Sequence, residues 1–263
     1  MSVQIFNDWI ARASLQKQPH QEVGVQWCLD LETKGKHIGS KTIRGGLIAD
    51  EMGLGKTIQI LGVLISNIKD HTLIVLPRAL LEQWDSVILK NFGVKAHVFH
   101  GLGKKTSLSV VKKNRFVITT YETVSKTTIL NQISWDRIVF DEAHRMRNRG
   151  TILWEGVAKL RSKIRWLLTG TPIQNGVADL SNLMSILGIS EAHAKDADEL
   201  KSLVGDLMLR RTKKDVGISL PPIHSHLIDV AWGTRAEREF SEDIHSMLSF
   251  SSVSKSKINQ NTA

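Results

Sequence analysis

The sequence predicts an α/β fold, in which a mostly parallel sheet is flanked by helices and followed by a small helical protrusion. Two observations support this fold class. Short, continuous runs of Val, Ile and Leu recur along the chain, as is typical of strands buried on both faces. Helical patterns separate these runs, and such alternation favours parallel pairing. The 263 residues are enough for one large α/β domain, or for one domain plus an appendage.

The expected elements follow from these patterns in chain order. An apolar run at residues 46–49 comes first. Strands are expected at residues 73–76, 116–119, 137–140 and 165–168, with weaker candidates at 94–99 and 226–230. Helices are expected at residues 57–68, 79–89, 151–160 and 179–187, and the whole of 177–209 has helical character. Residues 220–230 are expected to return to the sheet as a final strand or edge segment. The tail, 246–263, is rich in Ser, Lys and Asn and is expected to be disordered.

The bulk composition narrows the class of protein. A formal charge of +9 favours a polyanion as partner, although many proteins without such a partner are equally basic. No stretch is long and apolar enough for a membrane span, and the N-terminus lacks a signal pattern, so we expect an intracellular protein without a membrane partner. Cys28 is the only cysteine and is expected to be a half-buried thiol. His97, His100, His224 and His226 are too isolated from other ligands to suggest zinc.

The octapeptide DEMGLGKT, residues 50–57, predicts a phosphate-binding loop between a strand and a helix. Gly53 and Gly55 let the backbone approach an anion closely, and the N–H groups of the following helix would point at phosphate oxygens. Lys56 would reach the β- and γ-phosphates of ATP, and the Thr57 hydroxyl would bind Mg²⁺. The general pattern has Gly where this chain has Asp50, so the match is partial.

A carboxylate pair follows another apolar strand, about 85 residues after Lys56. Asp141 would hold Mg²⁺, directly or through water, and Glu142 would act as general base on the attacking water. By itself an Asp-Glu pair could be an exposed acidic turn. Its position after an apolar strand, together with the phosphate loop, favours the catalytic interpretation.

Polar residues with potential chemistry come directly after four of the expected strands. Ligands of parallel sheets bind beyond the carboxyl ends of the strands, so this shared position predicts a single site. The segments concerned are Pro77-Arg78, Thr120-Tyr121-Glu122, Asp141-Glu142-Ala143-His144 and Gly170-Thr171-Pro172.

Six motifs in order resemble those of the Swi/Snf-type ATPases of helicase superfamily two, the chromatin-remodelling and DNA-translocating class. The resemblance covers roughly residues 15–245. Its motifs are DEMGLGKT, LIVLPRALLEQW (73–84), VITTYETV (117–124), WDRIVFDEAHRMRN (135–148), RWLLTGTPIQN (165–175), and LRRTKKDV (209–216) with LPP (220–222). The segment QPHQEVGVQW (18–27) resembles the adenine-sensing segment of that family. The resemblance implies a RecA-like P-loop NTPase lobe that uses ATP and Mg²⁺ and binds double-stranded DNA.

The resemblance also implies roles for individual residues. Catalysis would rest on Glu142, Lys56 and Asp141, and Mg²⁺ on Thr57 and Asp141. ATP would bind at Gln21, which contacts adenine, and at Asp50, Glu51, Met52, Gly53, Leu54, Gly55, Lys56 and Thr57. Residues that couple the nucleotide state to DNA would be His144, Thr169, Gly170, Thr171 and Gln174. The tracking strand of DNA would lie along Pro77, Arg78, Thr120, Tyr121 and Glu122, where backbone N–H groups and hydroxyls would bind phosphates.

Several of these residues have a second interpretation. Tyr121 could be a core residue instead of a DNA neighbour, and Arg78 could be a solvated helix start. Arg210 and Arg211 could line the cleft that faces a second lobe, which we favour, or form a surface salt-bridge face. We interpret the tryptophans at 27, 84 and 166 as core or helix-packing residues. The Thr-Gly-Thr at 169–171 stands where RNA helicases of the superfamily usually carry Ser-Ala-Thr, so the resemblance implies DNA and not RNA.

The expected organisation has four parts. Residues 1–176 form the ATP-binding lobe with its adenine-sensing segment, 177–219 the helical protrusion, 220–245 the return to the lobe and the start of an inter-lobe connection, and 246–263 the tail. No second strand-helix series follows Pro222, so a second chain or a missing segment would supply lobe two. We therefore expect a DNA-dependent ATPase whose isolated chain is weakly active. A non-catalytic nucleotide- or DNA-binding module is the alternative, and an RNA helicase fragment a third. The protein is expected where DNA resides: the nucleus, or a viral or bacterial cytoplasm.

Overall fold

The computed structural model describes residues 2–126, 128–219, 221, 225–226 and 233–245. The chain divides into two compact units, residues 1–219 and 220–263. Within the second unit, residues 235–245 form a helix that carries two exposed ion pairs, Arg235–Glu239 and Arg238–Glu242. The expected strand or edge segment at 220–230 and the expected disordered tail at 246–263 lie mostly or wholly outside the described residues. All further description concerns residues 1–219.

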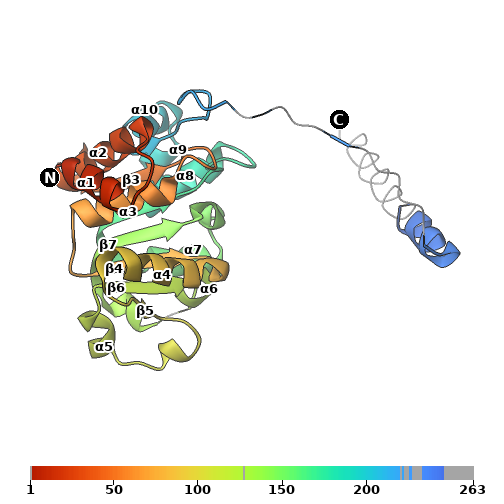
Figure 1. Ribbon diagram of the computed structural model, residues 1–263, viewed down its shortest axis with the longest axis horizontal. Coiled ribbons are helices and arrows are strands. Elements are labelled where there is room, and N and C mark those ends of the chain that lie inside the picture. The colour runs from red at the N-terminus through yellow and green to blue at the C-terminus, as the bar shows by residue number, and fades with distance from the viewer. Residues whose placement is uncertain (1, 127, 220, 222–224, 227–232, 246–263) are drawn as a thin grey trace. The chain divides into compact units, whose positions relative to one another are not determined.

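The first unit is built on a seven-stranded sheet in the order β5-β6-β4-β7-β8-β3-β9, in which every pair of neighbours is parallel. Its strands are β3 (Gly45–Ile48), β4 (Thr72–Leu76), β5 (His97–Val98), β6 (Phe116–Thr120), β7 (Ser134–Asp141), β8 (Arg161–Leu168) and β9 (Met208–Leu209). Figure 1 shows these strands with helices packed around them. The parallel α/β fold expected from the sequence is confirmed.

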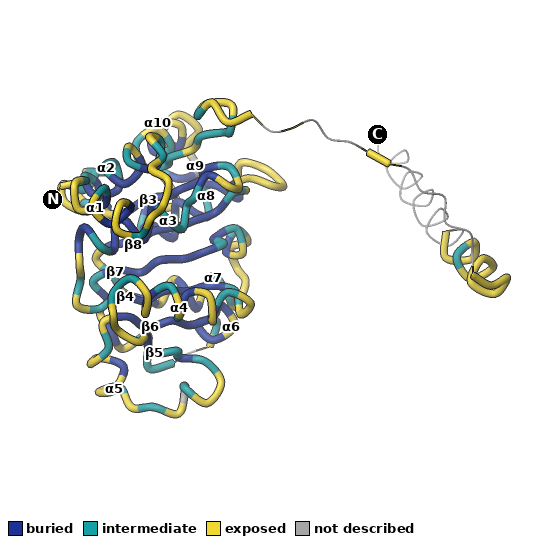
Figure 2. Tube along the Cα trace, in the orientation of Figure 1, coloured by how far each residue is buried: buried dark blue, intermediate teal, exposed yellow. Residues whose placement is uncertain are grey.

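The apolar runs form the central strands, as expected. Every residue of β3, β4 and β6 is buried, and the burial of these strands is visible in Figure 2. The weaker candidate at 94–99 contributes only the two residues of β5, at one edge of the sheet beside β6. The central strands could be predicted from the sequence because burial on both faces requires a continuous apolar run, whereas an edge strand of two residues lacks such a run.

Helices and short helical turns connect the strands. The α-helices are α1 (Gln4–Arg12), α2 (Pro19–Thr33), α3 (Lys56–Ser66), α4 (Leu81–Phe92), α5 (Leu108–Lys113), α6 (Tyr121–Val124), α7 (Ile152–Ala158), α8 (Val177–Ile186), α9 (Glu191–Lys195) and α10 (Ala197–Leu207). The 3₁₀ turns are η1 (Arg78–Leu80), η2 (Gly101–Lys104), η3 (Ile129–Gln132) and η4 (Ala143–Met146). Local signals fix their ends: Pro19 opens α2, Gly93 ends α4 in the left-handed conformation, and the Thr151 hydroxyl accepts a hydrogen bond from the Trp154 N–H at the start of α7.

The region after residue 176 is helical, but it does not remain a protrusion as far as residue 219. Helices α8, α9 and α10 pack on one another, and then Met208 and Leu209 form β9. This strand pairs with the open edge of β3, where the Ala49 N–H donates to the Leu209 carbonyl at 2.7 Å. The chain therefore rejoins the sheet about ten residues earlier than expected, because the β3 edge offers free hydrogen-bonding groups with which β9 pairs.

The sequence patterns did not identify several elements, among them helices α1, α2, α5 and α6 and the β1–β2 hairpin. Helix α1 packs on α3, and the antiparallel hairpin of β1 (Lys36–Ile38) and β2 (Lys41–Ile43) precedes β3. Cys28 is fully buried, not half-buried, and burial raises the pKa of its thiol well above the ordinary value. The interpretation of Trp84 and Trp166 as core residues is confirmed, and Trp27 packs against the Trp166 ring at 5.8 Å.

A buried ion pair joins α2 to the central strand β7. Both Glu32 and Arg137 are buried, and the Arg137 guanidinium donates two hydrogen bonds to the Glu32 carboxylate at 2.6 and 2.5 Å. The same carboxylate accepts from the Trp166 indole at 2.8 Å and from the Asn67 amide at 2.6 Å. All partners of the charge are thus supplied by protein groups, as a charge in the interior requires.

Candidate active site

Three neighbouring strands, β7, β8 and β3, end at the same edge of the sheet. In their registers Asp141 stands opposite Leu168, and Leu168 stands opposite Ile48. The carboxylate pair, the Thr-Gly-Thr segment and the phosphate loop follow these positions directly, so the fold brings together three motifs that are separate in the sequence. This edge is the usual ligand-binding edge of an open parallel sheet.

The phosphate loop, residues 50–57, is shaped by two glycines. Gly53 and Gly55 adopt positive φ angles of 90° and 79°, which side chains disfavour. A Cβ atom at Gly55 would lie only 2.3 Å from Nε2 of Gln21, so the end of that side chain would have to shift. Gln21, near the start of α2, donates to the Leu54 carbonyl at 3.3 Å, and His20 contacts the same oxygen at 3.0 Å. The segment expected to sense adenine therefore rests directly on the loop.

Lys56 begins helix α3 and lies at the centre of the site. Its Nζ donates to the backbone carbonyls of Asp50 at 2.8 Å and of Glu51 at 3.4 Å. Burial lowers the pKa of Lys56 from its usual value, and the negative charges of Glu142, Asp50 and Asp141 oppose that shift. The ammonium group thus has carboxylates on several sides but is bonded only to carbonyl oxygens, from which it can transfer to a phosphate.

Asp141 is held in place by groups from three elements. The Trp84 indole N–H donates to its Oδ2 at 2.9 Å, and the Glu142 N–H donates to its Oδ1 at 3.0 Å. The Tyr121 hydroxyl donates to the Asp141 backbone carbonyl at 2.7 Å. Burial raises the pKa of the Asp141 carboxyl, the Trp84 hydrogen bond lowers it, and the charge of Glu142 raises it further. No pattern in the sequence indicates the Trp84 contact, because it joins residues 57 positions apart.

A cavity of about 340 Å³ lies between the phosphate loop and the carboxylate pair. Its lining residues are Met52, Gly53, Gly55, Lys56, Thr57, Leu80, Gln83, Trp84, Asp141 and Glu142. A hydroxyl from Thr57 and a carboxylate from Asp141 on its wall fit Mg²⁺, which takes few protein ligands and completes its shell with phosphates and water. No group of three or more His, Cys, Asp or Glu side chains that could hold a metal occurs among the described residues.

Three of the residues expected to couple the nucleotide to DNA, His144, Thr169 and Thr171, form a connected chain of contacts. His144 Nδ1 lies 3.2 Å from a Glu142 oxygen and 3.2 Å from the Thr169 hydroxyl. That hydroxyl in turn accepts from the Thr171 N–H at 3.1 Å. Gln174 is placed by Asp179, whose carboxylate accepts from its N–H at 2.9 Å, and its side chain accepts a hydrogen bond from Arg147. Gly170 lies against Met52 and Lys56 of the loop.

The residues expected to lie along DNA differ in the solvent exposure of their side chains. Arg78 is exposed at the start of η1, and Pro77 is half-buried before it. Thr120 and Tyr121 are buried, and their hydroxyls are used inside the lobe, by Thr123 and by the Asp141 carbonyl respectively. The core interpretation of the Tyr121 side chain is therefore correct. A DNA contact by this segment would have to come from its backbone, or from Glu122, which is exposed and paired with Arg145.

Neither interpretation of Arg210 and Arg211 describes their positions fully. The Arg211 guanidinium forms an ion pair with the fully buried Asp50 at 2.5 Å, so it is neither a cleft wall nor a surface salt bridge. Arg210 donates to the carbonyls of Ala49 at 2.8 Å and of Gly170 at 3.4 Å, next to the loop. The partner of Arg211 also explains why Asp50 replaces the usual glycine: its carboxylate is an acceptor that a glycine could not supply.

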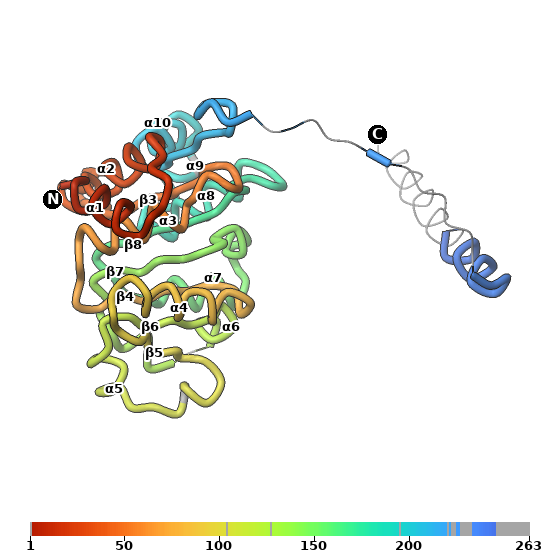
Figure 3. The backbone as a smooth tube through the Cα atoms, in the orientation of Figure 1, coloured from red at the N-terminus to blue at the C-terminus, as the bar shows by residue number. Residues whose placement is uncertain are grey.

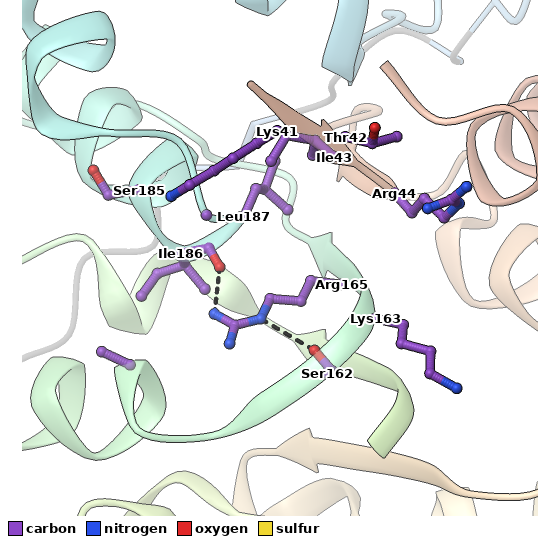
Figure 4. Close-up of a pocket in the computed structure, with 12 residues that line it drawn as sticks. Lys41, Thr42, Ile43, Arg44, Ser162, Lys163, Arg165, Ser185, Ile186 and Leu187 are labelled. Carbon is purple, nitrogen blue, oxygen red and sulfur yellow. Dashed lines mark hydrogen bonds between the residues drawn. The ribbon is translucent and has the colours of Figure 1, made fainter. Parts of the chain in front are cut away.

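A larger cavity, of about 470 Å³, lies near the β1–β2 hairpin and the end of α8 (Figure 4). Four of its lining residues are cationic (Lys41, Arg44, Lys163, Arg165), and none of those that the structure describes is acidic. Figure 4 shows Arg165 directed toward the Ile186 carbonyl and the Ser162 hydroxyl, to which it donates at 2.6 and 3.1 Å. Because no carboxylate is available for Mg²⁺ among the lining residues of this cavity, the smaller cavity at the phosphate loop is the better candidate for a nucleotide site.

The family model described as the SNF2-related domain matches residues 20–262. The chain belongs to this family. In this SNF2-related domain, residues of the phosphate loop line one cavity together with Asp141 and Glu142. The resemblance noted from the sequence motifs is thereby confirmed.

Several relatives share between 28% and 33% of the residues they align with this SNF2-related domain. An uncharacterised ATP-dependent helicase of Schizosaccharomyces pombe is 32% identical over 202 residues, which is 65% of this chain and 19% of that protein. The ISWI chromatin-remodeling complex ATPase ISW2 of Saccharomyces cerevisiae is 33% identical, covering 77% and 20%. A probable global transactivator of Orgyia pseudotsugata multicapsid polyhedrosis virus is 28% identical, covering 85% and 48%.

Among solved structures, the Sulfolobus solfataricus SWI2/SNF2 ATPase core in complex with dsDNA matches with a TM-score of 0.64 and 30% identity. The match covers 77% of this chain and 46% of that chain. The chain thus spans less than half the length of each of these relatives. The fold is that of one RecA-like lobe of an SNF2 ATPase. In the described part of the chain, none of the helices has the length and apolar character needed to cross a membrane.

Proposed function

We propose that this chain is the ATP-binding and hydrolysing lobe of a DNA-dependent ATPase of the translocase type. The observation that carries the proposal is the convergence of Lys56, Thr57, Asp141 and Glu142 on one cavity, from two strands that are not adjacent in the sheet. A nucleotide-binding module without turnover would have no physical need for both the carboxylate pair and the loop lysine. The relatives named as ATP-dependent helicase and as remodeling ATPase agree with this choice.

Binding of ATP would use the loop and the helix that follows it. The phosphates lie at the N-terminus of α3, where free N–H groups and the helix dipole favour negative charge. Lys56 leaves the Asp50 and Glu51 carbonyls and bonds to the β- and γ-phosphates. Gln21, which contacts the loop at Leu54, would read the adenine edge.

Hydrolysis would proceed through positioning and electrostatics. Thr57 and Asp141 hold Mg²⁺, which when bound neutralises charge on the β- and γ-phosphate oxygens. Glu142 orients the attacking water and accepts its proton. The contact of Glu142 with His144, and of His144 with Thr169, gives the base a direct connection to the Thr169–Thr171 segment, so the nucleotide state can be transmitted to that edge of the lobe.

Double-stranded DNA is the proposed polyanion. The support is the formal charge of +9, the exposed Arg78 beyond the end of β4, and the likeness to an SNF2 core solved with dsDNA. Contacts through Pro77, Arg78 and the backbone at 120–122 would go to phosphates, so binding would not depend on sequence. Such a protein would act wherever DNA resides.

The 263-residue polypeptide is proposed to hydrolyse ATP slowly by itself and not to translocate. It aligns with 46% of the SNF2 core, and a second lobe would supply the arginines that stabilise the transferring phosphate. An arginine of that kind is worth roughly 10³–10⁵ in rate in related enzymes.

The test is the ATPase rate with and without double-stranded DNA, with Lys56→Ala and Glu142→Gln as controls. Slow turnover that is stimulated by DNA and abolished by both substitutions supports the proposal. ATP binding without any turnover would favour the non-catalytic module. Stimulation by RNA alone would favour an RNA helicase fragment, and processive translocation by this polypeptide would contradict its proposed dependence on a second lobe.

A further inference from the structure

The segment of residues 209–213, which follows β9, runs beside residues 49–51 at the start of the phosphate loop. The Ala49 N–H donates to the Leu209 carbonyl at 2.7 Å, and the Glu51 N–H donates to the Arg211 carbonyl at 2.9 Å. Figure 3 shows α10, which leads into β9 and this segment, near β3 in the upper part of the view, and 161 positions separate Asp50 from Arg211. The start of the loop is therefore paired with the last part of this unit.

Arg211 joins this 209–213 segment to three parts of the nucleotide site. Its Nε and Nη2 donate to the two carboxylate oxygens of Asp50 at 3.0 and 2.5 Å, a bidentate arrangement on a fully buried acid. Its Nη2 also lies 2.9 Å from the Gln59 side-chain oxygen in α3, and its Nη1 donates to the His20 carbonyl at the start of α2. One guanidinium thus connects the loop, the helix that follows the loop, and the helix that carries Gln21.

A second ion pair holds the next loop residue. The Lys213 ammonium lies 2.7 Å from Oε1 of Glu51, and the Lys213 backbone N–H donates to Oε2 at 2.7 Å. The 209–213 segment consequently fixes both Asp50 and Glu51 by side chain and by backbone. The carbonyls of these same two residues are the acceptors of the Lys56 ammonium.

We propose that Arg211 is a positioning residue of the phosphate loop, and that the 209–213 segment is coupled to nucleotide binding. The proposal rests on the proposed function, because it concerns how Lys56 is presented to phosphates. Arg211 touches no reacting atom. It acts through Asp50, whose carbonyl sets the resting position of Lys56. Because the loop and the 209–213 segment are bonded to each other, a change in the segment changes the affinity of the loop for nucleotide. The coupling is reciprocal, so a nucleotide that orders the loop also orders residues 209–213.

The test uses the full chain and a fluorescent ATP analogue with Mg²⁺. Arg211→Lys keeps the charge but loses the bidentate fork. We expect its dissociation constant to rise by about tenfold or more, within the usual range of coupling between sites. Glu51→Gln removes the more exposed ion pair, with Lys213, and leaves the buried Arg211–Asp50 pair intact. It is expected to weaken nucleotide binding less than Arg211→Lys does. Lys214→Ala, in the same basic run but exposed, is the matched control and should bind as the wild type does.

A second measurement separates positioning from mere stabilisation. Amide hydrogen exchange of residues 209–213 should slow when ATP and Mg²⁺ bind to the wild type, and this change should be lost in Arg211→Lys. Circular dichroism establishes that each variant is folded at the temperature used. If folded Arg211→Lys and Glu51→Gln bind the analogue within twofold of the wild type, the inference is wrong while the proposed function stands. If the wild type itself binds no nucleotide, both are overturned.

Discussion

The buried Glu32–Arg137 pair offers the sharpest test of how this lobe is held together. Glu32→Gln keeps the shape of the side chain but removes its charge, and places an amide N–H₂ among donors from Arg137, Trp166 and Asn67. The Arg137 side chain is 1% exposed, so water cannot replace the lost counter-charge. Breaking one partner of a buried pair typically costs about 3–5 kcal/mol of unfolding free energy.

The size of the unit converts that cost into a thermal shift. A domain of this length loses about 2–4 °C of melting temperature per kcal/mol, so the expected fall is roughly 6–20 °C. Urea unfolding followed by tryptophan fluorescence measures the free energy directly, since Trp166 bonds to the altered group. Asp136→Asn breaks the exposed pair with Lys163 and is the control, with an expected loss below about 1 kcal/mol. A loss for Glu32→Gln no larger than for this control would refute the reasoning.

Three further predictions concern the site. Trp84→Phe keeps an aromatic ring but removes the hydrogen bond to Asp141, so binding of Mg²⁺·ATP, measured by titration calorimetry, should weaken by about tenfold, the cost of a bond to a charged group. Burial raises the pKa of Asp141, and its charged form is the one that would bind Mg²⁺, so the affinity for Mg²⁺·ATP should fall as pH drops through that raised pKa. In Trp84→Phe, which lacks the hydrogen bond that lowers this pKa, the fall should begin at higher pH. A pH profile equal to that of the wild type would contradict this. Gly55→Ala should weaken binding by about tenfold or more, because a side chain disfavours the φ of 79° there and its Cβ would displace the end of the Gln21 side chain; wild-type affinity would contradict this.

Asp141 also affects stability with a definite sign. Its pKa in the folded protein is raised, so the folded state binds that proton more tightly than the unfolded chain does. The ionised carboxylate therefore costs stability at neutral pH, and the cost is relieved as pH falls through the raised pKa. The low-pH condition that stabilises this group is the one in which it would bind Mg²⁺ less well, which is the usual conflict between stability and function at a buried site.

The central strands and the phosphate loop were predictable because their signals are local. A strand buried on both faces must be apolar throughout, and a loop with residues at positive φ selects glycine, as at Gly53 and Gly55. The short edge strand β9 was not found, and β5 was expected only as a weaker candidate at 94–99, since two residues carry no period and their pairing depends on which edge of the sheet is free. The strands of the β1–β2 hairpin were missed for a similar reason, since each has only three residues. Helix α1 was also missed, although Phe6, Trp9 and Ile10 lie on one buried face of it.

The sequence by itself determined the fold class, the family and the residues that converge on the proposed ATP site, because motif residues follow strand ends and parallel strands end at one edge. Only the tertiary structure decided the partners of those residues. Asp50 meets Arg211 across 161 positions, Trp84 meets Asp141 across 57, and Tyr121 turns inward to the Asp141 carbonyl. Contacts of this kind depend on the packing of whole elements, and no local pattern in the chain encodes which distant side chain will complete a buried charge.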